Sequence, residues 1–208
     1  MNTATDSALE SAIGALAVPG IAVGHRLIAP DDALALRPDE RDAFANSVDK
    51  VKRASGAARI VARSLMAQFG HPAQSVPKSA SGAPIWPSGY VGSLAHDARI
   101  AVAALARRSD FLSLGIDVEP AEPLDADLLD LVTTQSERRE ISGDLLQGRL
   151  LFTIKEAAYK AIHPLDGTFL EHHDVEVDLA AGTATARTGR TVRFRHGVSG
   201  HIVVLAFI

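Results

Sequence analysis

The segment 115–120, G-I-D-V-E-P, contains two acidic residues one position apart, Asp117 and Glu119. Because side chains alternate between the two faces of a β-strand, we expect both carboxylates on the same face. Two such carboxylates repel each other unless a cation or a shared proton relieves the repulsion. Oxygen ligands with no cysteine nearby favour Mg²⁺. The alternative is a strand end that carries two solvated acids.

A second group of residues stands in the segment 152–160, F-T-I-K-E-A-A-Y-K. In a helix, Glu156 and Lys160 share one face, and Lys155 and Tyr159 pair in the same way on a neighbouring face. Glu156 is therefore a candidate third metal ligand or general base, and Lys160 is a candidate for stabilising charge on a phosphate. The alternative is an ordinary surface Glu–Lys pair, which stabilises a helix by about 0.2–0.5 kcal/mol.

A local positive patch is expected on an otherwise acidic chain. No acidic residue follows Asp49 in a stretch that contains Lys50, Lys52, Arg53, Arg59 and Arg63. Guanidinium groups suit phosphate oxygens because their planar fork donates two parallel hydrogen bonds. The alternative is a solvated helix face.

Two further candidates precede the acidic segment. Trp86 is the only tryptophan, and the prolines that frame it make it suitable as the wall of a pocket. His96 ends the segment 92–96, G-S-L-A-H, and is placed to donate a hydrogen bond to a phosphate. A purely structural histidine is the alternative.

Strands and helices are predicted in both halves of the chain, so the fold class is α/β or α+β. The helical segments are 37–69, interrupted near Ser55-Gly56, then 124–131 and 145–162, the last ending before His163-Pro164. The strands are 21–28, 100–106 (where the alanines also allow a helix), 112–118, 175–179, 191–195 and 201–208. Residues 71–92 are expected to form a loop, because they are rich in proline and glycine. A division near residue 108 separates an N-terminal half, 1–108, from a C-terminal half, 109–208.

Composition excludes several classes of protein. The chain has 208 residues, is 47% hydrophobic and contains no cysteine, which excludes a disordered chain, a disulfide scaffold and thiol chemistry. Its net charge of −4 and aromatic content of 5% argue against nucleic-acid binding. No run approaches the roughly 20 apolar residues of a membrane-spanning helix. The N-terminus lacks the basic start of a secretory signal, so a cytoplasmic location is expected.

The order of these motifs along the chain resembles the 4'-phosphopantetheinyl transferase superfamily. A basic helix, W-P, G-S-x-x-H, G-I-D-V-E-P and F-x-x-K-E-A-x-Y-K follow one another, and P-L-D-G-T-F-L then precedes D-V-E-V. The resemblance runs from about residue 50 to the C-terminus and is closest to the compact bacterial type associated with siderophore and peptide synthetases. D-x-E followed by K-E-A-x-Y-K at this separation is highly specific.

The resemblance implies two similar α/β halves with the active site in the cleft between them. It also implies transfer of 4'-phosphopantetheine from coenzyme A to a serine of an acyl or peptidyl carrier protein, with release of adenosine 3',5'-bisphosphate. The expected partners are coenzyme A and the carrier protein, without nucleic acid or membrane, and the expected state is a monomer.

The same resemblance assigns roles to individual residues. Asp117, Glu119 and Glu156 match the acids that hold Mg²⁺, and Glu156 also matches the proposed base. Lys160 matches the lysine that contacts the phosphate and assists the leaving group. The residues expected to contact coenzyme A are Lys52, Arg59, Lys78, His96, Lys155 and Lys160.

Some positions depart from the superfamily pattern. Ala95 stands where a serine or threonine is usual, and Ala58 replaces the glycine before Arg59. These departures concern coenzyme A affinity rather than the chemistry. A coenzyme A-binding protein without activity and a Mg²⁺-dependent phosphohydrolase are therefore kept as alternatives.

Overall fold

The computed structural model describes residues 7–208, whose strands form two separate antiparallel sheets. The first sheet has the order β1-β3-β2, with β1 at Ile21–Leu27, β2 at Tyr90–His96 and β3 at Ile100–Arg107. The second has the order β4-β8-β7-β6-β5. Its strands are β4 Leu114–Pro120, β5 Val175–Asp178, β6 Thr183–Ala186, β7 Thr191–Val198 and β8 His201–Phe207.

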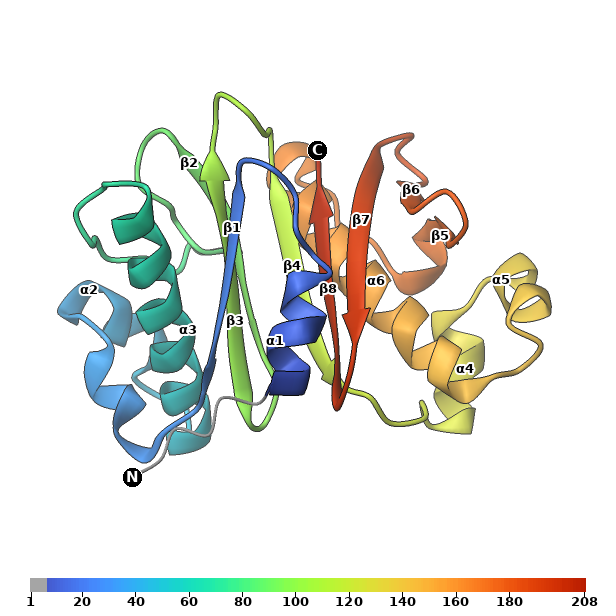
Figure 1. Ribbon diagram of the computed structural model, residues 1–208, viewed down its shortest axis with the longest axis horizontal. Helices are drawn as coiled ribbons and strands as arrows, with labels where there is room; N and C mark the ends of the chain where they lie inside the picture. Colours follow the sequence, from blue (N-terminus) through green and yellow to red (C-terminus); the bar gives the residue numbers. More distant parts are fainter. Residues whose placement is uncertain (1–6) are drawn as a thin grey trace.

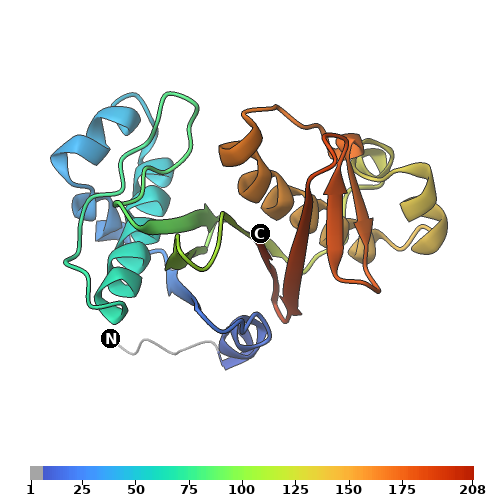
Figure 2. The same cartoon turned by 90° about the horizontal axis from the view of Figure 1, so that it is seen from above.

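One long helix packs against each sheet (Figure 1). Helix α3, Asp49–Gln68, covers the first sheet, and helix α6, Leu145–Asp166, covers the second. The two helices lie on the same side of the sheets, and α1, Ser7–Gly14, lies on the opposite side (Figure 2). The shorter helices are α2 Pro38–Arg41, α4 Ala126–Val132 and α5 Gln135–Glu140, with 3-10 turns η1 Pro30–Ala35, η2 Asp42–Phe44 and η3 His172–Asp174.

Strand alternation divides the core into layers. On β3, Ala103 and Leu105 pack toward α3, whereas Val102 and Ala104 face the α1 side. The layer on the α1 side also contains Leu9 of α1 and apolar residues of β4 and β8, so it runs across both sheets. Burial of this continuous apolar layer holds the two halves together.

The mixed helix-and-sheet class is confirmed, and the predicted strands are all present with shifted ends. Segment 100–106 is a strand and not a helix. Strands β2 and β6 and helices α1 and α5 were not predicted. No helix among residues 7–208 has the length and apolar content that crossing a bilayer requires.

Two predicted helix boundaries are wrong. The 37–69 segment breaks at 45–48 instead of at Ser55-Gly56, and α3 continues through both residues. Gly56 instead allows close packing, because a Cβ there would lie 1.9 Å from the carbonyl oxygen of Asp32. Helix α6 does not end before His163, but includes Pro164 and is capped by Gly167, which adopts a left-handed φ of 63°. Pro164 has no backbone N–H, so α6 lacks one hydrogen bond in its last turn and ends two residues later, at Asp166.

Candidate active site

Strand β4 directs its two carboxylates toward helix α6. Ile116 and Val118 pack in the core on the α1 side, so Asp117 and Glu119 face the other way. Gly115 brings the helix close, because a Cβ at this position would lie 1.8 Å from the carbonyl oxygen of Ala157. The backbone of α6 therefore lies directly against the strand that carries the acids.

Lys160 of α6 contacts the first of these acids. Its Nζ donates to Asp117 Oδ1 at 2.7 Å and to the carbonyl oxygen of Ile116 at 3.3 Å. Asp117 is buried, and burial raises the pKa of its carboxyl group although the nearby ammonium opposes this shift. Asp117 Oδ2 is also buried and has no hydrogen-bond partner among the described residues.

The other two acids are less enclosed. Glu119 Oε2 accepts from Arg149 Nη1 at 3.3 Å, and burial together with the charge of Asp117 raises the pKa of Glu119. Glu156 Oε1 lies 3.1 Å from His172 Nε2, and this hydrogen bond lowers the pKa of Glu156. The charge of Glu156 also raises the pKa of Asp117, so the three acids influence one another.

These carboxylates fit a divalent cation in their chemistry. Within residues 7–208, no group of three or more His, Cys, Asp or Glu side chains is already gathered tightly enough to hold a metal ion. The buried Asp117 Oδ2 nevertheless has no partner among these residues, and burial, with a smaller contribution from neighbouring carboxylates, raises the pKa values of Asp117 and Glu119. A hard cation with oxygen ligands would relieve both.

A cavity of about 280 Å³, bordered by the Lys160 that contacts Asp117, gathers four of the expected phosphate contacts. Arg59, Lys78, His96 and Lys160 all line it. Burial lowers the pKa of His96, and the positive charge of Lys160 lowers it further. Alanines 58 and 95, the two departures from the superfamily pattern, line the same cavity. The arrangement concentrates positive charge where a phosphate would lie beside Asp117.

Arg59 is held by a network that the sequence did not reveal. Its Nε donates to the carbonyl oxygen of Val76 at 2.9 Å and lies 3.8 Å from Oε1 of Glu40. Glu40 is fully buried and also pairs with Arg63 at 3.1 Å. Arg63 therefore stabilises the fold and does not lie on a solvated helix face. The sequence of the P-D-E-R segment indicates a short helix but does not indicate that its glutamate, Glu40, is buried.

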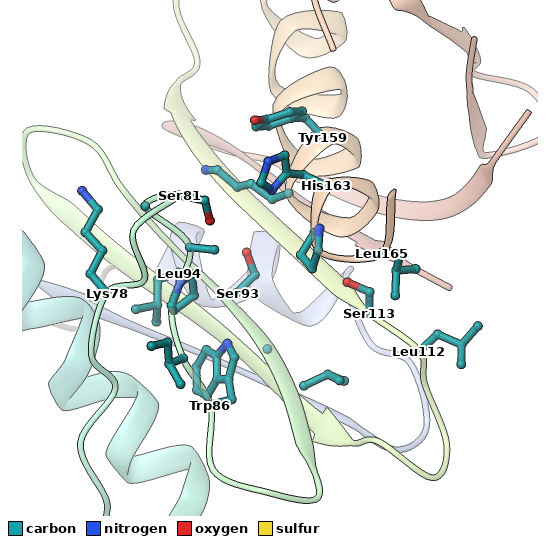
Figure 3. Close-up of a pocket in the computed structure, with 18 of the residues that line it drawn as sticks. Lys78, Ser81, Trp86, Ser93, Leu94, Leu112, Ser113, Tyr159, His163 and Leu165 are labelled. Atoms are coloured by element: carbon teal, nitrogen blue, oxygen red, sulfur yellow. The ribbon is translucent and has the colours of Figure 1, made fainter. Parts of the chain in front are cut away.

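A larger cavity of about 540 Å³ separates the loop 78–86 from helix α6 (Figure 3). Lys78, Ser81 and Trp86 line one side of it, and Tyr159 and His163 of α6 line the other. Lys160 borders both this cavity and the smaller one. Trp86 is thus a pocket wall, and the two cavities form one cleft between the halves of the chain.

Two of the predicted coenzyme A contacts lie elsewhere. Lys155 is 1% exposed, and its ammonium donates to Glu137 Oε2 at 2.7 Å and to the carbonyl oxygens of Val132 and His172, each at 2.9 Å. All three N–H groups are used within the protein, so Lys155 has none left for a phosphate. Lys52 lies on α3 but lines neither cavity of the cleft.

Comparison with known proteins assigns the family. Residues 39–106 match the 4'-phosphopantetheinyl transferase N-terminal domain, and residues 113–205 match the 4'-phosphopantetheinyl transferase superfamily. The chain is 40% identical over 168 residues to 4'-phosphopantetheinyl transferase Svp of Streptomyces mobaraensis, which covers 76% of this chain and 68% of that protein.

Two other relatives are similar to the same extent. The 4'-phosphopantetheinyl transferase Npt of Nocardia iowensis is 37% identical, and the match covers 82% of this chain and 78% of Npt. The 4'-phosphopantetheinyl transferase PptT of Mycobacterium tuberculosis is also 37% identical, and the match covers 76% of this chain and 69% of PptT. The solved holo-[acyl-carrier-protein] synthase of Thermotoga maritima matches 45% of this chain and 61% of its own at 20% identity, with a TM-score of 0.36. On the strength of the family match and the curated relatives, the chain belongs to the 4'-phosphopantetheinyl transferase superfamily.

Proposed function

We propose that this transferase moves 4'-phosphopantetheine from coenzyme A to a serine of a carrier protein, with Mg²⁺ held by Asp117, Glu119 and Glu156. The observation that supports this most directly is the position of Lys160, which borders both cavities and donates to Asp117 at 2.7 Å. The basic residues suited to binding phosphates and the acidic residues suited to binding a metal ion therefore both lie next to Lys160. In our proposal the half 1–108 binds the nucleotide, and the half 109–208 holds the metal.

The cleft residues bind and orient coenzyme A before the chemical step. Arg59, Lys78 and His96 would hold phosphate oxygens in the smaller cavity, and Lys160 would reach the pyrophosphate. The larger cavity, with Trp86 and Tyr159 on its two sides, has room for the pantetheine chain. Positioning of this kind is a major part of what enzymes of phosphoryl transfer contribute.

The transfer requires one proton acceptor and stabilisation of the departing phosphate. The serine oxygen forms a bond to the phosphorus that carries the pantetheine, and the bond from that phosphorus to the bridging oxygen breaks. Glu156 takes the serine proton, and adenosine 3',5'-bisphosphate leaves with the electron pair of the broken bond. Lys160 stabilises the negative charge on the leaving oxygen. Bound Mg²⁺ would supply further charge neutralisation.

The environment of Glu156 keeps its carboxyl group ionised, as a base must be. Its hydrogen bond to His172 lowers the pKa of the carboxyl group, so the group is ionised at neutral pH. Its other oxygen, Oε2, has no hydrogen-bond partner in the part of the chain that the structure describes. We propose that a monomer acts in the cytoplasm, where coenzyme A is available, without nucleic acid or membrane.

Intact-mass measurement of several apo carrier proteins tests the proposal. Each carrier is incubated with this chain, coenzyme A and Mg²⁺, and we expect the carrier to gain one phosphopantetheine group. EDTA should prevent the gain, and so should a carrier in which alanine replaces the acceptor serine. The Lys160→Met variant should be slow, whereas Lys50→Met, which changes a lysine outside both cavities, should match the wild type.

Other results would identify the two alternatives. Coenzyme A that binds without modifying any carrier would indicate a binding protein without activity. Cleavage of coenzyme A in the absence of a carrier would indicate a phosphohydrolase. A mass gain that persists after removal of all divalent metal would contradict the Mg²⁺ assignment.

A further inference from the structure

Asp97 and His201 form a buried, close polar pair between the two halves of the chain. His201 Nε2 lies 3.0 Å from Asp97 Oδ2, and each side chain is 6% exposed. The other oxygen of the carboxylate, Oδ1, accepts from the backbone N–H groups of Arg99 and Ile100 at 2.6 Å. Asp97 therefore closes the turn between β2 and β3 with one oxygen and reaches the second sheet with the other.

The pair lies between the two sides of the proposed site. Asp97 directly follows His96, which lines the smaller cavity. His201 begins β8 and is the register partner of Pro120, the residue after Glu119. The contact thus joins the turn that carries a phosphate-binding candidate to the strand end that carries a metal-binding candidate.

The remaining contact between the sheets is apolar. The two sheets share no backbone ladder, and their common core layer is formed by apolar side chains. Within residues 21–208, no other side-chain hydrogen bond or ion pair joins the first sheet, including its β2–β3 turn, to the strands of the second. Apolar burial is non-directional, so it resists separation of the sheets better than it resists sliding. A polar contact between one nitrogen and one oxygen at 3.0 Å depends on the separation of these two atoms, so it does resist sliding.

We infer that the Asp97–His201 pair fixes the alignment of the two halves across the cleft, and that both are positioning residues. The effect of the pair on the reaction rate rests on the proposed function, in which His96 binds a phosphate and Glu119 holds the metal. A shift of one sheet against the other would change the distance between these two residues. A displacement of about 1 Å at a reacting centre can cost about a hundredfold in rate. The structural consequence, a better defined distance between the halves, does not depend on any activity.

The test removes the pair without leaving a buried charge. In the double variant His201→Leu/Asp97→Asn, the asparagine still accepts the turn hydrogen bonds and the leucine cannot bond to it. His201→Gln keeps a donor near the position of Nε2 and serves as the conservative variant. His196→Leu makes the same type of change at an exposed histidine of β7 and is the matched control. Where the double variant does not fold, His201→Phe/Asp97→Asn, which keeps a ring of similar size at position 201, replaces it.

Spin labels report the alignment directly. The chain contains no cysteine, so Gln68→Cys on α3 and Gln147→Cys on α6 give two unique and exposed labelling sites. Pulsed electron paramagnetic resonance then measures the distribution of distances between the two halves. We expect the double variant to broaden or shift this distribution, whereas His201→Gln and His196→Leu retain that of the wild type.

Kinetics on the unlabelled proteins complete the test. The double variant should lose about tenfold or more in kcat/KM for coenzyme A, and His201→Gln should remain within about threefold of the wild type. An unchanged distance distribution in the double variant would overturn the inference, as would a broadening that both controls share. A wild-type protein that modifies no carrier would refute the proposed function, while the distances would still decide the role of the pair.

Discussion

Lys160 hydrogen-bonds to one oxygen of Asp117 and leaves the other oxygen buried and unpaired. The Nζ–Oδ1 distance is 2.7 Å, and Oδ2 has no partner among residues 7–208. An ionised carboxylate with one unpaired buried oxygen is costly to maintain. The arrangement indicates that Asp117 is retained for binding rather than for stability of the unliganded fold.

The first prediction concerns the Asp117→Asn variant. Burial raises the pKa of Asp117, so the stabilisation that this group contributes is present below its unfolded-state pKa and is lost as the pH rises through the folded value. At neutral pH without metal, removing the charge should therefore leave the melting temperature equal or raise it by a few degrees, about 2–4 °C per kcal/mol. Carrier modification should be abolished.

Thermal unfolding at neutral pH and below about pH 4 checks this prediction. The advantage of the variant should disappear at the lower pH, because the wild-type carboxyl group is then protonated as well. A variant that melts well below the wild type at neutral pH would show that the contact with Lys160 outweighs the cost of burial.

The second prediction separates binding from folding at Arg59 and Arg63. Both arginines pair with the buried Glu40, but only Arg59 lines the cavity. Each alanine variant should lose stability, but less than the cost of about 3–5 kcal/mol for leaving a buried charge unpaired, because Glu40 keeps the other arginine. Only Arg59→Ala should also weaken coenzyme A binding, with a reduced dependence on salt. Calorimetric titration and denaturant unfolding of both variants measure the two effects, and equal affinities would refute the phosphate role of Arg59.

Sequence spacing predicted the residues that share one face of a regular element. Asp117 and Glu119 do face one side of β4, because a strand alternates whatever it packs against. Similarly, Glu156 and Lys160 do lie on one helix, α6. The superfamily was predicted from the order of the motifs and is confirmed by the comparisons.

Contacts between distant segments could not be predicted in this way. Lys155 and Glu156 are neighbours in sequence, and helical periodicity alone does not show which of them faces inward. The answer depends on Glu137, Val132 and His172, which reach Lys155 only after α4, α5 and η3 have packed on α6. The partnership of Asp97 with His201, separated by 104 positions, depends on tertiary packing in the same way.

The third prediction concerns the acid limb of the reaction. The hydrogen bond from His172 is the main cause of the lowered pKa of Glu156. His172→Leu should therefore raise the pKa of Glu156, and the activity should begin to fall at a higher pH as the medium is acidified. The profile of kcat is measured with saturating coenzyme A and the same saturating Mg²⁺ for every variant, so that the effect of the metal on all three acids is common to the variants and cancels in the comparison.

The neighbouring His173 provides the control for this experiment. It lies on the same turn but its Nε2 bonds to the carbonyl oxygen of Asp130 and not to Glu156. His173→Leu should retain the wild-type acid limb. If His172→Leu also retains it, Glu156 is not the group whose ionisation limits the rate.

The fourth prediction tests the reassignment of Lys155 from coenzyme A binding to the fold. Lys155→Met leaves Glu137 buried without its cation and should lose about 3–5 kcal/mol of stability. Adding Glu137→Gln should recover part of this loss, because the amide oxygen can still accept from one of the backbone N–H groups of Thr134 and Val177 that the carboxylate now binds.

In both variants, the folded protein should bind coenzyme A within about twofold of the wild type, since Lys155 lines neither cavity. Urea unfolding and calorimetric titration give the two quantities separately. A large loss of affinity in a variant of unchanged stability would return Lys155 to the binding site. A recovery confined to stability would establish that Lys155, the first lysine of K-E-A-x-Y-K, stabilises the helix that carries the proposed base, Glu156.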